Sequence, residues 1–263
     1  MPELLNKLQI FPISNWYAEL SLASELGFDD FELLYDKEKV FLEIISVQEN
    51  HNILCLDLDV NNKVIRPKSI CLDFISSMSL INKTKIEKFI DELRKAILLF
   101  RNSKIQMLVV PFCDDSVVPD LATLKEALQT IDDSNLDSLA ADCGLQLALE
   151  LTLPGHMLVE GFSKHSFTNI GICFDLGNIR SSGLQPESGI LDLGSLVRHV
   201  HIKDRSVGGS NVMLGHGDVD FEACFKSLKK INYTGICIME TRYFTDPIKE
   251  ASTNLDYLKG LVV

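Results

Sequence analysis

Four ionisable side chains stand at the ends of four short apolar runs, and their types suit a divalent cation. They are Glu150, Asp175, His201 and Glu240. Carboxylate oxygens with one imidazole nitrogen suit Mn²⁺, Mg²⁺, Co²⁺ or Zn²⁺, and the geometry of the site decides among these ions. Such a cation can hold two adjacent oxygens of a polyol and polarise a carbonyl, which acidifies the neighbouring C–H. Carboxylates beside it can then remove and return the proton, and we expect Glu150 and Glu240 to flank the substrate from two sides.

These side chains can act together only if the fold brings the ends of their runs to one place. The runs are Leu145–Glu150, Ile170–Asp175, Arg198–Lys203 and Ile236–Glu240. Each run is short enough for a buried strand, and a helical pattern separates it from the next. In a parallel α/β barrel the carboxyl ends of successive strands converge on one mouth, where the chemistry takes place.

The first half of the chain continues the same alternation of strands and helices. It contributes four further strands, Leu8–Phe11, Asp30–Leu34, Ile53–Asp59 and Lys104–Pro111. The expected helices are Trp16–Gly27, Glu38–Gln48, Thr84–Phe100, Leu121–Ala141, Phe221–Ile231 and Pro247–Leu261. Eight strand–helix units without a linker predict an α/β fold, a single (β/α)8 TIM barrel domain over residues 1–263. An open doubly wound sheet would show a glycine-rich turn after its first strand, and this chain has none.

The alternation of side chains along each strand supports a common site. In the seventh strand, His199, His201 and Lys203 share one face, and Val200 and Ile202 share the other. The apolar pair should pack under the helices, which leaves the polar face toward the barrel interior. The same alternation places all four proposed ligands inside. Three buried carboxylates at one mouth are costly unless a cation compensates them, although ordinary salt-bridge partners are the alternative.

Composition limits the classes of partner and compartment. The 263 residues fit one barrel of roughly 250 residues, and 46% hydrophobic with 24% charged residues is typical of a soluble globular protein. A net charge of −12 and a pI of about 4.9 argue against a nucleic-acid or membrane partner, which would favour a basic face. Seven cysteines without a CxxC pair indicate reduced thiols. With neither a signal peptide nor a spanning segment visible, we expect a cytoplasmic protein.

At these residues the chain resembles the sugar isomerase/epimerase superfamily of xylose isomerase-like barrels. The motifs that carry the resemblance are Glu150, Asp175-Leu-Gly-Asn178, His199-Val-His201-Ile-Lys203-Asp204, Leu214-Gly-His-Gly217-Asp-Val-Asp220-Phe221 and Glu240-Thr241. The resemblance spans the whole chain in its length and in its alternation of strands and helices, but the specific motifs cover only residues 145–242. It implies one divalent metal ion, bound by Glu150, Asp175, His201 and Glu240. It also implies that the two glutamates act as catalytic acid and base.

Departures from this family pattern bear on the substrate. Free-ketose epimerases of the family carry a substrate-binding His where this chain has Asn178, a Glu where it has His156, and an Arg where it has Val207. Arg205 lies near that last position. The proposed substrate contacts are therefore Lys203, Asn178, His156, Arg205, Arg242 and His216. Lys203 is equally well explained as the partner of a carboxylate at the mouth.

The leading hypothesis is a metal-dependent isomerase or epimerase of carbohydrate metabolism. It would act on a ketose or ketose phosphate by proton transfer through a metal-bound enediolate. A first alternative is a polyol-ketone (inosose-type) dehydratase that uses the same metal site, and a second is a non-catalytic sugar-binding barrel. In each case the partner is a small sugar or sugar phosphate, and the sequence leaves a homo-oligomer open.

Overall fold

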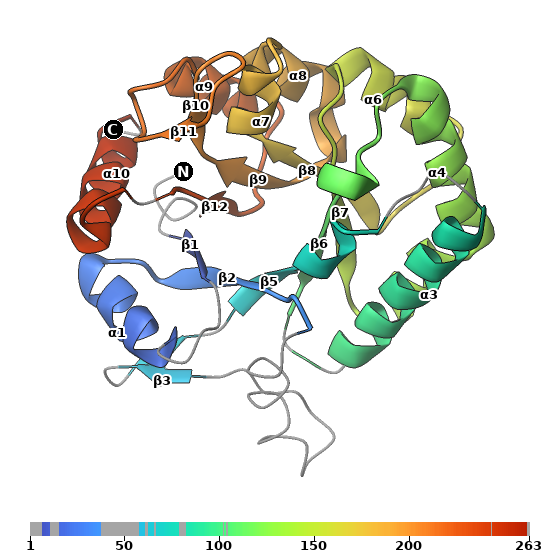
Figure 1. Ribbon diagram of the computed structural model, residues 1–263, viewed down its shortest axis with the longest axis horizontal. Helices are drawn as coiled ribbons and strands as arrows, with labels where there is room; N and C mark the ends of the chain where they lie inside the picture. Colours follow the sequence, from blue (N-terminus) through green and yellow to red (C-terminus); the bar gives the residue numbers. More distant parts are fainter. Residues whose placement is uncertain are drawn as a thin grey trace.

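Eight parallel strands close into a barrel, seen end-on in Figure 1. The structure is a computed structural model that describes residues 7–10, 16–37, 58–60, 63–65, 67–78, 83–101, 103, 105–242 and 244–261. The strands are β1 (Lys7–Ile10), β2 (Asp30–Leu34), β5 (Pro67–Cys71), β6 (Met107–Pro111), β7 (Gln146–Glu150), β8 (Ile170–Asp175), β9 (Val197–Ile202) and β12 (Cys237–Met239). They pair in the order β1-β12-β9-β8-β7-β6-β5-β2. The predicted (β/α)8 TIM barrel is thereby confirmed.

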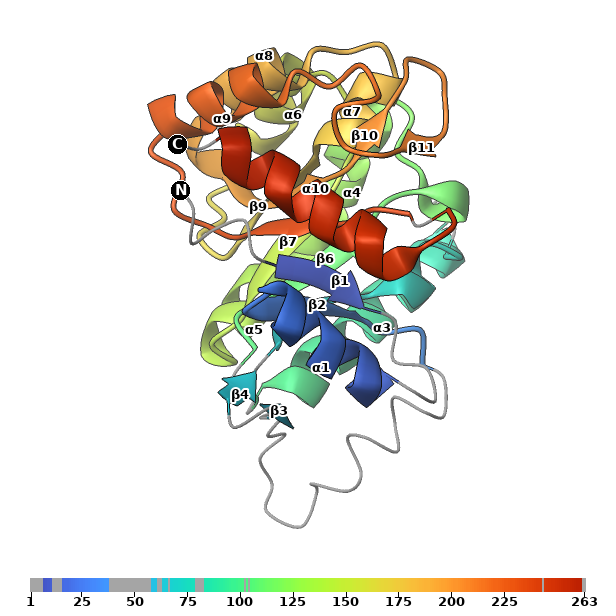
Figure 2. The ribbon, with the colours of Figure 1, turned by 90° about the vertical axis from the view of Figure 1, so that its left-hand side faces the viewer.

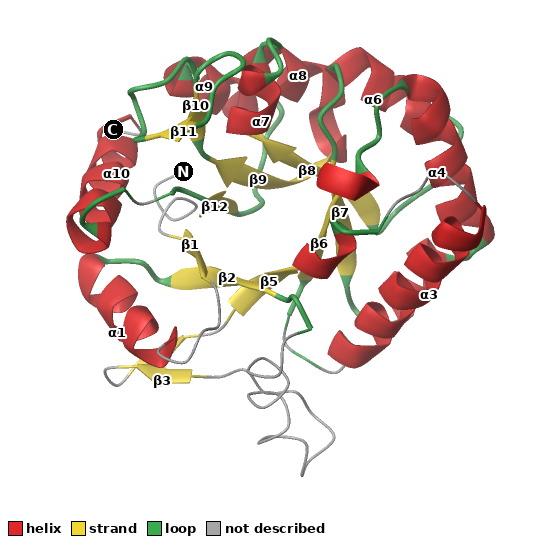
Figure 3. Cartoon of the chain, viewed as in Figure 1, coloured by secondary structure: helices red, strands yellow, loops and turns green. Residues whose placement is uncertain are grey.

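Helices surround this barrel on the outside, as the side view in Figure 2 and the colours of Figure 3 show. They are α1 (Trp16–Leu26), α3 (Lys83–Phe100), α4 (Leu121–Asp133), α5 (Leu136–Asp142), α6 (Gly155–Phe162), α7 (Leu176–Ser181), α8 (Pro186–Leu193), α9 (Phe221–Lys230) and α10 (Pro247–Leu261). The helix α1 ends before Gly27, which has a φ of +99° and follows the helix as a left-handed residue. The carboxylate of Asp220 caps α9 by accepting a bond of 2.9 Å from the N–H of Ala223. Among the described residues, no helix combines the length and apolarity that crossing a bilayer requires.

The core has two layers that follow the alternation along the strands. Between strands and helices, Val200 and Ile202 of β9 join a large apolar cluster. Inside the barrel, a smaller cluster is formed by strand residues alone, namely Leu34, Cys71, Met107, Val109, Ala148 and Cys173. The inward and outward faces predicted for β8 and β9 are therefore those observed.

One predicted barrel strand is wrong. The third strand of the barrel is β5, which pairs with β2 and β6, and not Ile53–Asp59. Residues 58–59 belong instead to β3 (Leu58–Val60), which pairs in antiparallel fashion with β4 (Lys63–Ile65) apart from the barrel. Residues 53–57 and the predicted helix 38–48 lie outside the described residues. The alternating apolar pattern marks a strand but not the sheet it joins, and β5 escaped notice because it begins with proline and contains Lys68 and Ser69.

Short elements complete the rim. A two-stranded hairpin, β10 (Asp204–Arg205) with β11 (Asn211–Val212), follows β9 directly. The 3-10 turns η3 (Asp73–Ile75) and η4 (Asp114–Ser116) follow β5 and β6, and η5 (Gly194–Leu196) precedes β9. The carboxylate of Asp204 accepts backbone bonds from Gly215, Gly217 and Val219, at 2.9, 2.9 and 3.2 Å. This residue therefore fixes the glycine-rich loop after the hairpin against the barrel.

Candidate metal centre

The four acid and imidazole side chains of the predicted site lie together at the carboxyl end of the barrel. One ligand atom from each of Glu150, Asp175, His201 and Glu240 lies within 4.8 Å of the others. Nδ1 of His201 lies 2.8 Å from Oε2 of Glu240. It also lies 3.8 Å from Oε2 of Glu150 and 3.9 Å from Oδ2 of Asp175. Strand pairing explains the convergence, because Asp175 and His201 are register partners on neighbouring strands.

The two carboxylate oxygens of Asp175 have different surroundings, one at the start of a helix and the other in this cluster. Its Oδ1 accepts a bond of 2.8 Å from the N–H of Asn178 and so caps α7. Its Oδ2 is buried and faces the cluster, 3.9 Å from Nδ1 of His201. Gly177 lets the first turn of α7 approach Lys203, because a Cβ there would lie 2.3 Å from Cγ of the lysine.

Lys203 lies among the acids of the cluster. Its Nζ lies 2.9 Å from Oδ2 of Asp175 and 2.6 Å from Oε1 of Glu240. The pairing of this lysine with carboxylates at the mouth, which the sequence left open, is thus what the structure shows. A contact between Lys203 and substrate remains a prediction.

A second polar chain runs from the cluster to the hairpin. Nδ2 of Asn178 donates to Oε1 of Glu150 at 2.9 Å, and Nη1 of Arg205 donates to Oδ1 of Asn178 at 2.9 Å. Nε of Arg205 also donates to the carbonyl of Gly209 at 3.1 Å. Asn178 and Arg205 therefore lie beside the cluster, where they orient Glu150.

The remaining predicted substrate contacts lie farther out. His156 begins α6, His216 lies in the glycine-rich loop and Arg242 follows β12, and all three are exposed. In the ranges that the structure describes, none of them forms a hydrogen bond or ion pair with the four clustered side chains. Their roles stay predictions.

The sequence interpretation missed Glu32, a fully buried carboxylate on β2. Its Oε1 lies 3.0 Å from Nε2 of His201, and its Oε2 lies 2.9 Å from Nε2 of His199. Burial by itself would raise the pKa of Glu32, but His201 and His199 hold it well below its usual value. A signal was present, since Glu32 alternates with Phe31 and Leu33, which both face the helices.

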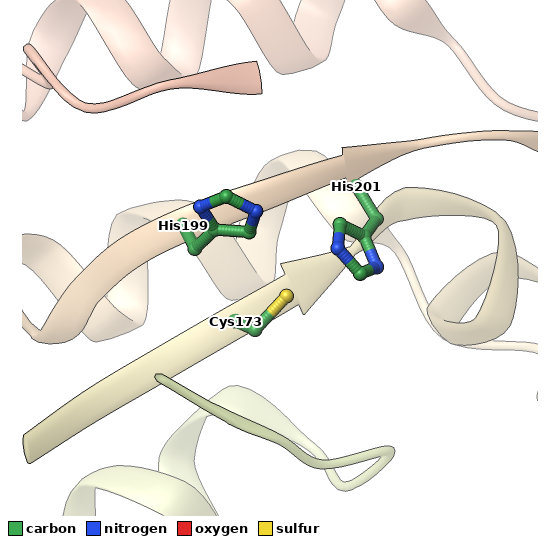
Figure 4. Close-up of side chains that lie close together, drawn as sticks. All are labelled: Cys173, His199 and His201. Carbon is green, nitrogen blue, oxygen red and sulfur yellow. The ribbon is translucent and has the colours of Figure 1, made fainter. Parts of the chain in front are cut away.

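A second group of ligating side chains shares His201. Figure 4 shows Cys173 of β8 beside His199 and His201 of β9, all three fully buried. The described side chains therefore include a second group of possible ligands, which overlaps the first at His201. Burial raises the pKa of the Cys173 thiol, which keeps the sulfur protonated and a poor ligand at neutral pH. The oxygen-rich group around Glu150 is the better candidate for a hard divalent ion.

The electrostatic balance of the main cluster fits such an ion. Burial, with Asp175 and Glu240 nearby, raises the pKa of Glu150 to about 7. Burial would also raise the pKa of Glu240, but the charges of Lys203 and His201 outweigh this effect and lower that pKa to about 2. Three ionised carboxylates and one ammonium leave two negative charges, which a divalent cation neutralises. Buried Nδ1 of His201 lies 2.8 Å from an oxygen of Glu240 and within 3.9 Å of oxygens of Glu150 and Asp175, so the donor atoms are close enough together to hold a cation.

A cavity of about 720 Å³ opens near the ends of β2, β5 and β6. It is lined by Lys37, Phe74, Ser77, Met78, Lys85, Lys88, Glu92, Asp114, Asp115 and Val117. None of the four clustered side chains lines it. Its lysines are balanced by an equal number of acidic residues, so the cavity has no strong positive potential that would attract an anion.

Known proteins share this architecture. The chain is 26% identical to the L-ribulose-5-phosphate 3-epimerase UlaE of Escherichia coli O1:K1, over 93% of this chain and 89% of that protein. A solved L-ribulose 3-epimerase superposes with a TM-score of 0.73 at 16% identity, covering 97% of this chain and 94% of that one. A xylose isomerase domain protein from Planctomyces limnophilus gives a TM-score of 0.72 at 18% identity, covering 97% and 96%. The family model described as xylose isomerase-like TIM barrel matches residues 20–261, and the chain therefore belongs to that family.

Proposed function

We propose that this protein is a divalent-metal-dependent epimerase or isomerase of a ketose or ketose phosphate. The observation that carries the proposal is the convergence of one ligand atom from each of Glu150, Asp175, His201 and Glu240 within 4.8 Å. His201 Nδ1 and Asp175 Oδ2 are buried within this group, where a cation between the four side chains would offset the charge of the acids. Glu150, Asp175, His201 and Glu240 would hold it.

The relatives support the same class of reaction. UlaE and the solved L-ribulose 3-epimerase are sugar epimerases by name, and the first acts on a phosphorylated ketose. They support the prediction that this chain is an enzyme, a sugar isomerase or epimerase. Whether its own ketose carries a phosphate is a question for the assay.

We infer the roles of the chain's own residues from their positions. A bound divalent cation would supply polarisation of the substrate carbonyl and so acidify the adjacent C–H. Glu240 stays ionised at neutral pH and can accept that proton, while Glu150, which a bound cation would keep ionised, can accept and return a proton from another side. The Lys203 ammonium, between Asp175 and Glu240, can stabilise negative charge on a substrate oxygen. Return of the proton to the opposite face inverts the carbon, and its return to the neighbouring carbon isomerises the sugar.

The test combines metal analysis with solvent exchange. The purified protein, reconstituted with Mn²⁺ and desalted, is expected to retain one ion per chain. It is then incubated in D₂O with a panel of pentuloses and hexuloses, each free and phosphorylated. Deuterium incorporation with unchanged composition supports the proposal.

Two other outcomes would point elsewhere. Loss of water from a polyol ketone would indicate the dehydratase. Sugar binding without bound metal or exchange would indicate the non-catalytic barrel, and either result would overturn the proposal.

A further inference from the structure

The carboxylate of Glu32 is held by partners from three other strands of the barrel. Nε2 of Gln9 on β1 donates to its Oε1 at 2.9 Å, and Oγ of Ser69 on β5 donates to its Oε2 at 2.6 Å. On β9, Nε2 of His201 lies 3.0 Å from Oε1 and Nε2 of His199 lies 2.9 Å from Oε2. With two neighbours at each oxygen and no exposed surface, this carboxylate has a fixed position.

This arrangement determines which nitrogen of His201 faces the acid cluster. An ionised carboxylate only accepts hydrogen bonds, so the Nε2 that faces Oε1 of Glu32 carries a proton and donates. Nδ1 is then the nitrogen that faces Glu150, Asp175 and Glu240. A cation bound among those side chains would take the lone pair of Nδ1 in place of a proton.

The second histidine restrains the plane of the first. The rings of His199 and His201 meet edge to face, with centroids 5.2 Å apart and an angle of 78° between planes. Both rings direct Nε2 to the same carboxylate, one to each oxygen. Rotation of His201 would therefore break its contact with Glu32 and collide with a neighbour that is held by the same group.

We propose that Glu32 is a positioning residue of the metal centre. Its carboxylate holds the ring of His201 by Nε2, in the orientation that directs Nδ1 toward the cation site. The proposal rests on the proposed function, because it requires a metal at the cluster. Acceptors behind metal-binding histidines commonly fix the ligand in this way, and their loss typically lowers metal affinity about 10- to 100-fold.

The test uses Glu32→Met, which keeps a side chain of similar length but removes the acceptor. Isothermal titration with Mn²⁺ is expected to show an affinity about 10- to 100-fold below that of the wild type. In parallel, ¹⁵N-histidine NMR of the wild type should show Nε2 of His201 as a hydrogen-bonded N–H. In Glu32→Met the resonance of this N–H should lose the shift that the hydrogen bond causes. A residue with only a packing role would change stability but not this resonance.

Ser69→Ala is the matched control. It removes another buried donor to the same carboxylate but leaves the acceptor of His201 in place. We expect lower stability, an unchanged Nε2 resonance of His201 and an Mn²⁺ affinity close to that of the wild type. If Glu32→Met does not fold, the wild-type spectrum still decides, since a His201 Nε2 without a proton would overturn the proposal.

The two proposals fail in different ways. A wild-type protein that binds no Mn²⁺ contradicts the proposed metal-dependent function. A wild type that binds Mn²⁺, together with a folded Glu32→Met of equal affinity, contradicts the role of Glu32 alone.

Discussion

Nζ of Lys203 lies 2.6 Å from Oε1 of Glu240, so a buried ammonium already neutralises one of the acids proposed to bind metal. The same nitrogen lies 2.9 Å from Oδ2 of Asp175. Lys203 thus has two effects of opposite sign on a cation at this site. It keeps the acids together when no metal is bound, and it repels the metal when one arrives.

Replacing Lys203 with Met should therefore separate stability from affinity. The metal-free variant leaves two buried carboxylates without their counter-ion, and we expect a loss of about 3–5 kcal/mol in unfolding free energy. Mn²⁺ should bind more tightly than to the wild type and restore much of that loss. Urea denaturation with and without Mn²⁺ measures both effects. The control is Lys226→Met, which removes an exposed pair with Glu222 and should leave the unfolding free energy nearly unchanged.

Metal affinity should rise with pH through the range in which Glu150 ionises. Its pKa is raised from 4.5 to about 7, so the metal-free protein loses stability from this group as pH rises through that interval. A cation binds the ionised form of Glu150, so binding should release close to one proton more at about pH 6 than at about pH 8.5. Titration calorimetry in buffers of different ionisation heat counts these protons. Equal release at both values would contradict the assignment to Glu150.

Glu150→Gln and Glu240→Gln should each abolish net conversion of the substrate. Proton transfer from a positioned carboxylate is worth about 10²–10⁴-fold, and any loss of metal would add to the effect. Solvent deuterium exchange with excess Mn²⁺ is the decisive measurement, with metal content determined in the same samples. One variant should retain exchange from a single face of the substrate. Two metal-loaded variants that turn over at the parent rate would show that neither glutamate is a base.

Asp204→Ala should destabilise the loop that follows the hairpin. Three backbone N–H groups lose their acceptor, and buried donors without a partner cost about 1–3 kcal/mol each where solvent cannot reach them. We expect a total of about 3 kcal/mol by urea denaturation, since water can reach part of the loop. Asp218→Ala is the control, because its carboxylate accepts only one exposed bond, from Val207. It should cost less than about 1 kcal/mol.

Most of the barrel could be predicted because its strands are buried on both faces. Runs such as Ile170–Asp175 are apolar for most of their length, bounded by polar residues and separated by amphipathic helices. The third strand fails this criterion. Its inward-facing Ser69 donates to Glu32, so a polar network inside the barrel makes the segment look like a loop.

The ligand types of the site could be predicted from the sequence, but the buried carboxylate that positions His201 could not. Four side chains on neighbouring strand ends are visible from spacing alone, because the register of parallel strands brings those ends together. The contact of Glu32 with His201 joins residues 169 positions apart and depends on closure of the barrel. Such a pairing has no local pattern, and only the alternation along β2 indicates that Glu32 faces inward.

The cap that Asp175 provides for α7 also bears on which ions the centre accepts. One oxygen of this carboxylate is already committed to the N–H of Asn178, so only the other is free for coordination. Calcium often takes a carboxylate through both oxygens and needs six to eight ligands, whereas Mg²⁺ accepts one oxygen from each. Calcium would have to open the first turn of a helix to gain its second contact. The helix cap therefore disfavours binding of Ca²⁺ relative to the smaller Mg²⁺, although the two ions carry the same charge.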